Sequence, residues 1–315
     1  MTKYREIKGT LIQNVSADPP ASFEGQVWYN TTSNVLKIDK GALVSAWATG
    51  GTMGTARRAL GNAGTQTAGL AFGGSGPTGA TESYDGTSWT EVNDLNNARI
   101  SLSGAGTQTA ALAFGGGSPG GQTETWNGSN WTEVNDLNTV RGYFTGCGAD
   151  NTSALAVGGS PPTAVTESWN GTNWTEVNDL NTARANAAAV GDVPSALAFG
   201  GAPPDPGGNT VTESWNGTNW TEVNDLNTAR NNLGGAGTQT AALAFGGESG
   251  PSSVGNTETW NGTNWTETTD LNTPIFDMGH AGSATAALSF GGRNPITAQT
   301  EEFSETGGIE TITSS

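Results

Sequence analysis

Short apolar segments alternate with polar, glycine-rich segments along most of the chain, and none shows helical periodicity. The four segments that follow Arg184 illustrate the pattern: NAAAVGD, SALAFGG, VTESW and WTEV. Small, β-branched and aromatic residues bounded by glycine are typical of short strands. An Asn-Gly pair lies between the last two segments and predicts a tight hairpin turn, because such turns require positive φ angles. The pattern therefore predicts a unit of four short antiparallel strands.

This unit is repeated six times. The motif LAFGG, or a close relative, recurs at intervals of 42, 43, 42, 46 and 45 residues. A tryptophan followed ten positions later by an arginine recurs in step with it, as at Trp174 and Arg184. In the sixth copy, Trp265 is followed by Ile275 instead. Four-stranded units at this period are typical of β-propeller blades. We therefore expect an all-β, six-bladed β-propeller over residues 46–315.

The sequence leaves open how the ring closes. The fourth strand of the sixth blade is either Ile309–Thr313 or, from the other end of the chain, Leu43–Trp47. Trp47 is in register with the repeated tryptophans, which favours the second arrangement. If both strands form, the N-terminal strands begin a partial seventh blade.

The order of motifs within a unit resembles the kelch repeat. The unit from Arg57 to Trp89 shows the resemblance most clearly, with AFGG followed by YDGTSW. It covers residues 47–315 in six copies and implies a kelch-like propeller of four-stranded antiparallel blades. The Asn-Gly turns and the high identity between copies depart from the usual kelch pattern.

Residues 1–45 lie outside the repeat. VWYN and VLKI, within the segment from Asp18 to Ile38, predict a β-hairpin. The segment resembles N-terminal segments in structural proteins of tailed bacteriophages, notably marine ones. The resemblance implies attachment to other virion proteins, a place in the virion after synthesis in the host cytoplasm, and a homo-oligomer in a symmetric particle. The alternative is an ordinary lead-in hairpin packed on the propeller.

Charge narrows the range of partners. The net charge is −17, and from residue 41 onward seven arginines face 25 acidic groups. Such a body repels nucleic acid and anionic membrane surfaces. No apolar stretch approaches the roughly 20 residues of a membrane-spanning helix, and the N-terminus lacks the apolar core of a signal peptide. We therefore expect no nucleic-acid partner and no membrane insertion.

Catalytic and metal-binding patterns are not found in the sequence. The chain has one cysteine, Cys147, and one histidine, His280. A single cysteine forms neither a disulfide framework nor a cysteine metal cluster. His280 is not accompanied by a nucleophile elbow, and no calcium-loop motif is present. We therefore predict that the protein is not an enzyme and uses no cofactor or metal.

The residues that mark the repeat are expected to be structural. We expect the arginines to pair with aspartates of the same blade-crossing loops, and the repeated Glu167/Glu176 and Glu213/Glu222 to make framework hydrogen bonds. The alternative for the arginines is a ring of charge around the pore. The aspartates are Asp94, Asp136, Asp179 and Asp225. The repeat residues are Trp89, Trp131, Trp174, Trp220 and Trp265; Arg99, Arg141, Arg184 and Arg230; and Gly73, Gly115, Gly158, Gly200, Gly246 and Gly291.

The connections between the second and third strands of each unit vary while the frame stays fixed. We expect them to share one face with the loops that join the blades, an arrangement in which a rigid frame presents a recognition surface. The alternative is that they vary because nothing constrains them. The candidate binding residues are Thr78, Pro119, Pro161, Pro162, Pro203, Asp205, Ser252, Ser253 and Asn294.

These features favour an adhesion protein of a bacteriophage particle, as a fibre, tail or capsid appendage that binds a host surface glycan or protein. An intracellular kelch scaffold for protein–protein interaction is the first alternative. A glycan-active propeller enzyme is the second, and it requires carboxylates clustered in one cleft.

Overall fold

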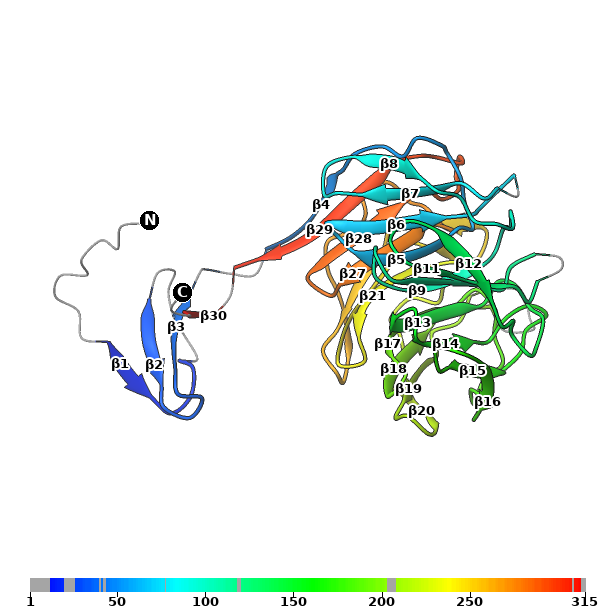
Figure 1. The fold of residues 1–315 in the computed structure, drawn as a ribbon. Helices are drawn as coiled ribbons and strands as arrows, with labels where there is room; N and C mark the ends of the chain where they lie inside the picture. Colours follow the sequence, from blue (N-terminus) through cyan, green and yellow to red (C-terminus); the bar gives the residue numbers. More distant parts are fainter. Residues whose placement is uncertain are drawn as a thin grey trace. The chain divides into compact units, whose positions relative to one another are not determined.

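The computed structural model describes residues 12–19, 26–39, 41, 44–76, 78–117, 120–202, 208–307 and 309–312. All regular elements in this part of the chain are β-strands. Six four-stranded antiparallel sheets form the blades of a propeller (Figure 1). We number the blades in chain order and name their strands a to d from the axis outward.

Each of the first four blades is formed by four consecutive strands. Blade 1 contains β5 (Gly61–Thr65), β6 (Ala68–Phe72), β7 (Thr81–Tyr84) and β8 (Trp89–Val92). Blade 2 contains β9 (Ser103–Gly106), β10 (Ala111–Phe114), β11 (Thr123–Trp126) and β12 (Trp131–Val134). Blade 3 contains β13 (Thr145–Asp150), β14 (Ser153–Val157), β15 (Thr166–Trp169) and β16 (Trp174–Val177). Blade 4 contains β17 (Ala188–Asp192), β18 (Ser195–Phe199), β19 (Thr212–Trp215) and β20 (Trp220–Val223).

Blades 5 and 6 depart from this simple order. Blade 5 contains β21 (Gly234–Thr238), β22 (Ala241–Phe245), β25 (Thr257–Trp260) and β26 (Trp265–Glu267). Its b–c loop carries a short hairpin of β23 (Glu248–Ser249) and β24 (Ser252–Ser253). Blade 6 contains β27 (Gly279–Ser283), β28 (Ala286–Phe290), β29 (Thr300–Thr306) and, as strand d, β4 (Val44–Thr49).

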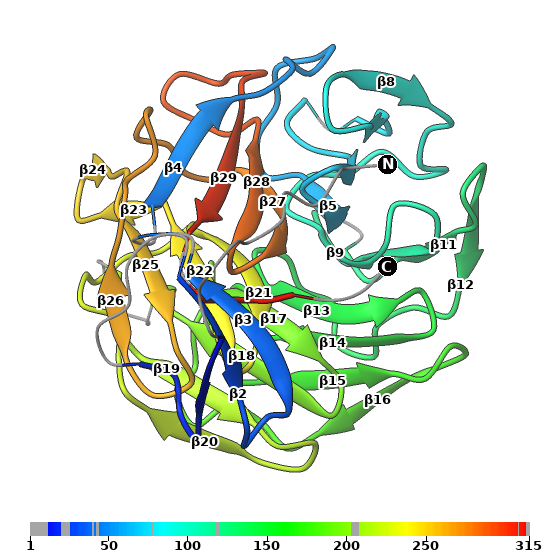
Figure 2. The same cartoon turned by 90° about the vertical axis from the view of Figure 1, so that its left-hand side faces the viewer.

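The ring is closed by the N-terminal part of the chain. The innermost strands contact one another in the order β5, β9, β13, β17, β21 and β27, and β27 contacts β5 (Figure 2). Because β4 lies beside β29, the prediction that Leu43–Trp47 supplies the sixth outer strand is confirmed. The alternative strand Ile309–Thr313 is wrong, since β30 (Ile309–Ile312) pairs with another sheet. No seventh blade forms among the residues that the structure describes.

The other sheet belongs to a separate compact unit, residues 1–45 and 305–315, and the propeller unit spans 46–304. The propeller therefore ends eleven residues earlier than the sequence suggested. The sheet contains β1 (Gln13–Val15), β2 (Val27–Asn30), β3 (Val35–Asp39) and β30, in that order. The predicted hairpin is present as the antiparallel pair of β2 and β3.

A partly exposed carboxylate, that of Asp18, joins several residues of this N-terminal sheet. Trp28 and Asn30 donate hydrogen bonds to Asp18 Oδ1, at 3.1 and 2.8 Å. Lys37 Nζ lies 2.7 Å from Asp18 Oδ2. These contacts lower the pKa of Asp18, chiefly through the hydrogen bond from Lys37.

The hydrophobic core lies between blades rather than in one central mass. Between blades 3 and 4, Leu155 and Val157 pack in one cluster with Ala198 and the tryptophan pair Trp215 and Trp220. The strand-d tryptophan of every blade also donates a hydrogen bond of 2.9–3.2 Å to a threonine hydroxyl of the preceding blade. These pairs are Trp89–Thr300, Trp131–Thr81, Trp174–Thr123, Trp220–Thr166, Trp265–Thr212 and Trp47–Thr257. The tryptophans therefore join blades by packing and by hydrogen bonding.

Candidate functional site

The b–c loops and the d–a loops lie together on one end of the propeller, here called the loop face. Isolated β-bridges join them, as at Thr163 and Arg184, and at Asn231 and Glu248. The a–b and c–d turns lie at the opposite ends of the same strands, because the strands of each blade are antiparallel.

The repeated arginines do not pair with the predicted aspartates. Each pairs with a strand-c glutamate of the blade that it leads into, at 2.5–3.2 Å, and the arginine and glutamate side chains are buried. The pairs are Arg57–Glu82, Arg99–Glu124, Arg141–Glu167, Arg184–Glu213 and Arg230–Glu258. Because these guanidinium groups are buried in the frame, the alternative of a charged ring around the pore is also wrong.

The glutamates hold the incoming loop by more than charge. Glu213 Oε2 accepts hydrogen bonds from Asn181 N and Nδ2, at 2.7 and 2.9 Å, and Oε1 accepts one from Thr182 N at 3.2 Å. Glu222, its neighbour across strands c and d, is exposed. Only the strand-c member of each predicted glutamate pair therefore belongs to the buried frame.

The predicted aspartates bind the backbone at the start of strand c instead of the arginines. Asp179 Oδ1 accepts a hydrogen bond of 3.1 Å from the backbone N–H of Thr166, at the start of strand c. Equivalent bonds join Asp94 to Thr81, Asp136 to Thr123, Asp225 to Thr212 and Asp270 to Thr257. The aspartates therefore fix where the third strand begins.

The double glycines end strand b in a conformation that other residues avoid. The first glycine of each motif has φ between 61° and 68°. At Gly200, a Cβ atom would also lie 2.8 Å from the carbonyl oxygen of Arg230. The turn and the close approach of the arginine loop together account for this glycine.

The structure brings two of the predicted loop residues together. Asn294 Nδ2 donates a hydrogen bond of 2.5 Å to Ser253 Oγ. Both residues line a cleft of about 380 Å³ between the b–c loops of blades 5 and 6, with Glu248, Phe276 and Arg293. Arg293 lies over the Phe276 ring, 5.4 Å from its centroid.

The remaining loop candidates are dispersed. Pro161 and Pro162 are exposed on blade 3, and Ser252 is exposed on blade 5. Thr78 bridges to Arg99 and accepts a hydrogen bond from Ala80 N, so it shapes its own loop. Pro119, Pro203 and Asp205 lie outside the described residues.

A second hollow, at the mouth of the central pore, was not predicted. Six residues, each two positions after the repeated arginine or its replacement Ile275, adopt φ angles of 50–60°. The backbone N–H of each donates to the carbonyl oxygen of its counterpart in the preceding blade, at 2.8–3.1 Å, which closes a ring of six hydrogen bonds. The residues are Ala59, Ser101, Tyr143, Asn186, Asn232 and Asp277. We call this set the pore ring.

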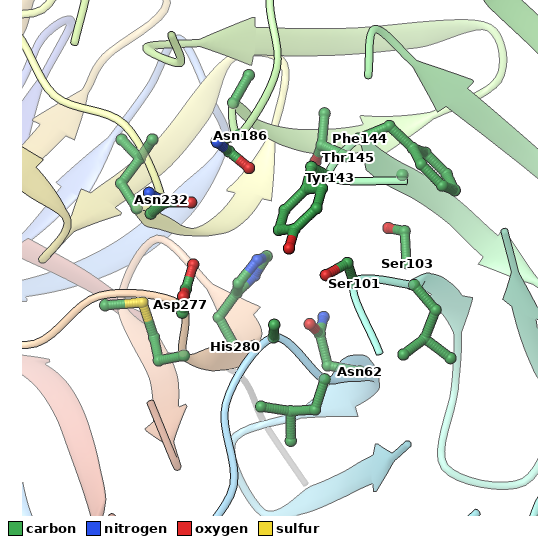
Figure 3. A pocket seen from close by; sticks show the side chains of 17 residues that line it. Asn62, Ser101, Ser103, Tyr143, Phe144, Thr145, Asn186, Asn232, Asp277 and His280 are labelled. Atoms are coloured by element: carbon green, nitrogen blue, oxygen red, sulfur yellow. The ribbon is translucent and has the colours of Figure 1, made fainter. Parts of the chain in front are cut away.

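The pore ring carries five kinds of side chain on one repeated backbone conformation. Figure 3 shows Ser101, Tyr143, Asn186, Asn232 and Asp277 around one hollow, with His280 beneath them. The signal for this ring in the sequence was variation, between otherwise similar repeats, at the position two residues after the repeated arginine.

Two titratable groups of this hollow are perturbed. Burial raises the pKa of Asp277, while Arg58 Nη1, 2.9 Å from Asp277 Oδ2, opposes the shift. Burial lowers the pKa of His280 to about 4, so its imidazole is neutral at pH 7.

Two further observations concern groups of metal-ligand side chains and long apolar helices. Those residues contain no cluster of three or more histidine, cysteine, aspartate or glutamate side chains placed to hold a metal. Within the same ranges there is no helix long and apolar enough to span a membrane.

Comparison of the fold identifies its type. The structure of YjhT matches with a TM-score of 0.67 and 11% sequence identity, covering 82% of this chain and 99% of YjhT. YjhT is a kelch-type propeller. The fold of this protein is a kelch-like β-propeller. At this identity the likeness concerns the fold alone. Neither the known protein families nor the curated proteins give a match to the sequence.

Proposed function

We propose that this kelch-like propeller is a non-enzymatic recognition protein on a bacteriophage particle. Its N-terminal unit attaches to other virion proteins, and its loop face binds a host surface glycan or protein. A propeller fold is consistent with a protein-interaction module. Beyond the fold, we propose that the protein is part of a phage particle and that the loop face is its binding surface.

One feature of blade 6 carries the proposal. In blades 1 to 5 a short turn joins strands c and d, as the turn from Asn170 to Asn173 does in blade 3. In blade 6 the corresponding ends of β29 and β4 continue instead into residues 305–315 and 1–45. Both chain passages therefore leave the propeller at the end opposite the loop face. The loop face is therefore free of the passages to residues 1–45 and 305–315, which suits recognition by that face.

The distribution of variation supports the same assignment. The Arg–Glu pairs, the Trp–Thr bonds and the capping aspartates are repeated around the ring, whereas the loop face presents different residues in each blade. A frame that is nearly constant and a face that differs are what recognition by loops requires.

In the two hollows of the loop face, the carboxylates favour binding over glycan cleavage. A pair of carboxylates flanks the bond in most glycoside hydrolysis. Among described residues, the cleft between blades 5 and 6 contains one carboxylate, Glu248, and the pore mouth contains one, Asp277. Asp277 is paired with Arg58.

Electron microscopy of purified particles labelled with an antibody to the chain tests the location. We expect label on the particle, and its absence from intact particles would overturn the virion assignment. Binding of the recombinant full chain to host cells tests the face. Replacing the loop 248–256 with the sequence of loop 160–165 should weaken binding, whereas Thr172→Ala, in a turn at the opposite end, should not. Equal binding by both variants would contradict recognition by that loop.

A further inference from the structure

The mouth of the pore has the properties of a small binding site. It is a hollow of about 90 Å³, and a second space of about 90 Å³ continues along the axis below it. A water molecule occupies roughly 10–15 Å³ on this measure, so the mouth holds several water-sized groups. Its walls combine Leu60, Leu102, Phe144, Leu233 and Met278 with the polar side chains of the pore ring. Ligand sites are typically apolar hollows with a few converging polar groups.

A buried hydroxyl without a partner points into this hollow. Ser101 is 6% exposed, and its Oγ makes no hydrogen bond with any described residue. Figure 3 shows this hydroxyl turned toward the interior of the hollow, where the hydroxyl of Tyr143 also points. Leaving a buried hydroxyl unpaired is unfavourable, because the group has lost its hydrogen bonds to water. A bound molecule that hydrogen-bonds to Ser101 would remove that cost.

The electrostatics of the hollow favour a neutral ligand. Asp277 is neutralised by Arg58, and the imidazole of His280 is uncharged at pH 7. Asn186 and Asn62 offer amides, which both donate and accept hydrogen bonds. Asn232 offers its Oδ1 as an acceptor, because its Nδ2 donates to Asn231 Oδ1 and Glu248 Oε2. An anion would meet the Asp277 carboxylate, and a cation would have to replace Arg58. Hydroxyl groups, in contrast, can satisfy serine, tyrosine and amide partners together.

Tyr143 supplies a platform for an apolar face. Its side chain is 45% exposed although it lines the hollow. An aromatic ring with a polar end contacts C–H groups with its face while its hydroxyl makes a hydrogen bond. Alternating hydroxyl and C–H surfaces are the distinguishing chemistry of a pyranose ring.

We propose that the pore mouth binds a single neutral sugar residue, with Ser101, Tyr143, Asn186 and Asn232 hydrogen-bonding its hydroxyl groups. The site lies on the loop face and rests on the proposed recognition of a host surface, for which it names one ligand class. At about 90 Å³ the hollow takes one edge of the ring, and the rest of the sugar and of a glycan would lie outside it.

The only histidine of the chain provides a direct readout, because His280 lines the hollow and its ring signals need no assignment against others. The full chain is titrated at pH 7 with D-glucose, D-galactose, D-mannose and N-acetylglucosamine, and with glucuronic acid as the anionic comparator. The imidazole signals are followed by NMR. We expect at least one neutral sugar to shift them in a saturable way, and glucuronic acid to leave them unchanged.

Two conservative variants test the contacts. Tyr143→Phe removes only a hydroxyl, and Ser101→Ala is compatible with the backbone because Ala59 has φ 50° at the equivalent position. Each variant should weaken the affinity for the sugar about three- to tenfold, which corresponds to one lost hydrogen bond. Thr240→Ala, an exposed hydroxyl deletion at the a–b end of blade 5, should bind as the unmodified chain does.

Each contrary result has a distinct meaning. No shift of His280 with any neutral sugar, a shift only with glucuronic acid, or unchanged affinity in both variants would overturn the sugar site. If cell binding and particle labelling persist in those cases, the proposed function stands without it. If a neutral sugar binds as expected but the chain is absent from particles, the sugar site stands and the virion assignment fails.

Discussion

Trp47 Nε1 donates a hydrogen bond of 3.2 Å to Thr257 Oγ1, joining residues 210 positions apart. An equivalent Trp–Thr hydrogen bond joins each of the other five blades to the preceding blade. In four of them the two residues are 50–54 positions apart, and in blade 1 Trp89 bonds to Thr300 of blade 6. Trp47 also packs against Phe245 and Phe303, with ring centroids at 5.0 and 5.2 Å. One residue from the N-terminal part of the chain therefore completes the interface between blades 5 and 6.

Replacement of this tryptophan should weaken closure of the ring. We expect Trp47→Ala to lower the free energy of unfolding by about 3–5 kcal/mol, because it removes a buried aromatic side chain and a hydrogen bond. Urea denaturation followed by circular dichroism measures the loss. Val44→Ala, on the same strand but 60% exposed, is the control and should change stability by less than about 0.5 kcal/mol. Similar losses in both variants would show that Trp47 does not close the ring.

The buried ion pairs should be costly to break singly and cheaper to remove together. Arg184→Met leaves the Glu213 carboxylate buried without its cation, which costs about 3–5 kcal/mol. The double variant Arg184→Met/Glu213→Gln should recover much of that loss. Denaturation of the single and double variants gives the coupling energy, and strictly additive losses would contradict a direct pairing.

Blade 6 contains a natural counterpart of the broken pair. Glu301 keeps the hydrogen bonds from Asn272 and Thr273, but Ile275 stands in the place of the arginine. No cation of a described residue lies within ion-pair distance of Glu301. We expect Glu301→Gln to cost less than about 1.5 kcal/mol, well below Glu213→Gln, because no buried guanidinium loses its partner. Equal costs in a denaturation series would refute this difference.

Acid should destabilise the propeller through His280. The unfolded histidine takes up a proton below about pH 6.5, whereas the folded one stays neutral until its pKa of about 4. The unfolded state therefore binds more protons between these values, and stability that is complete above pH 6.5 falls as the pH approaches 4. The contribution is about 1–3 kcal/mol.

The matched variant is His280→Asn, since Asn62 occupies the equivalent position of blade 1. Free energies of unfolding at pH 7.5 and 4.5 should differ less in the variant than in the unmodified chain. An unchanged difference would assign the acid sensitivity to other groups.

Cys147 should report unfolding without any mutation. Burial raises the pKa of its thiol to about 12, so the folded protein presents very little thiolate at pH 8. We expect labelling by a thiol reagent to be slow in the native protein and fast in urea. Rapid labelling under native conditions would mean that strand a of blade 3 opens readily.

The sequence was sufficient to predict the blades because the same local pattern of short strands and turns occurs six times. It also favoured the correct closing strand, since Trp47 stands in register with the other tryptophans. The sequence did not decide which sheet Ile309–Thr313 joins, because a short β-branched segment fits the edge of many sheets. Only the pairing of β30 with β3 shows which edge it takes.

Partners far apart in sequence were the harder problem. Each predicted aspartate lies five residues before its arginine, as Asp179 does before Arg184, and that nearness in the same loop suggested the pairing. The true partner, Glu213, is 29 residues away and arrives through the fold of the next blade. The pore ring was missed for the same reason. Its six residues converge only around the axis, and no local pattern marks them as neighbours.

Closure by β4 makes the ring dependent on the pairing of two strands far apart in the chain. Strand d of blade 6 (β4) precedes every other blade strand, whereas its partner β29 follows only after five blades. β4 therefore stays unpaired during translation until the five blades between it and β29 have been made. A product that stops short of β29 keeps an open edge on the last blade, and its Trp47 lacks the contact with Phe303. Only a chain that contains both β4 and β29 can therefore become a ring.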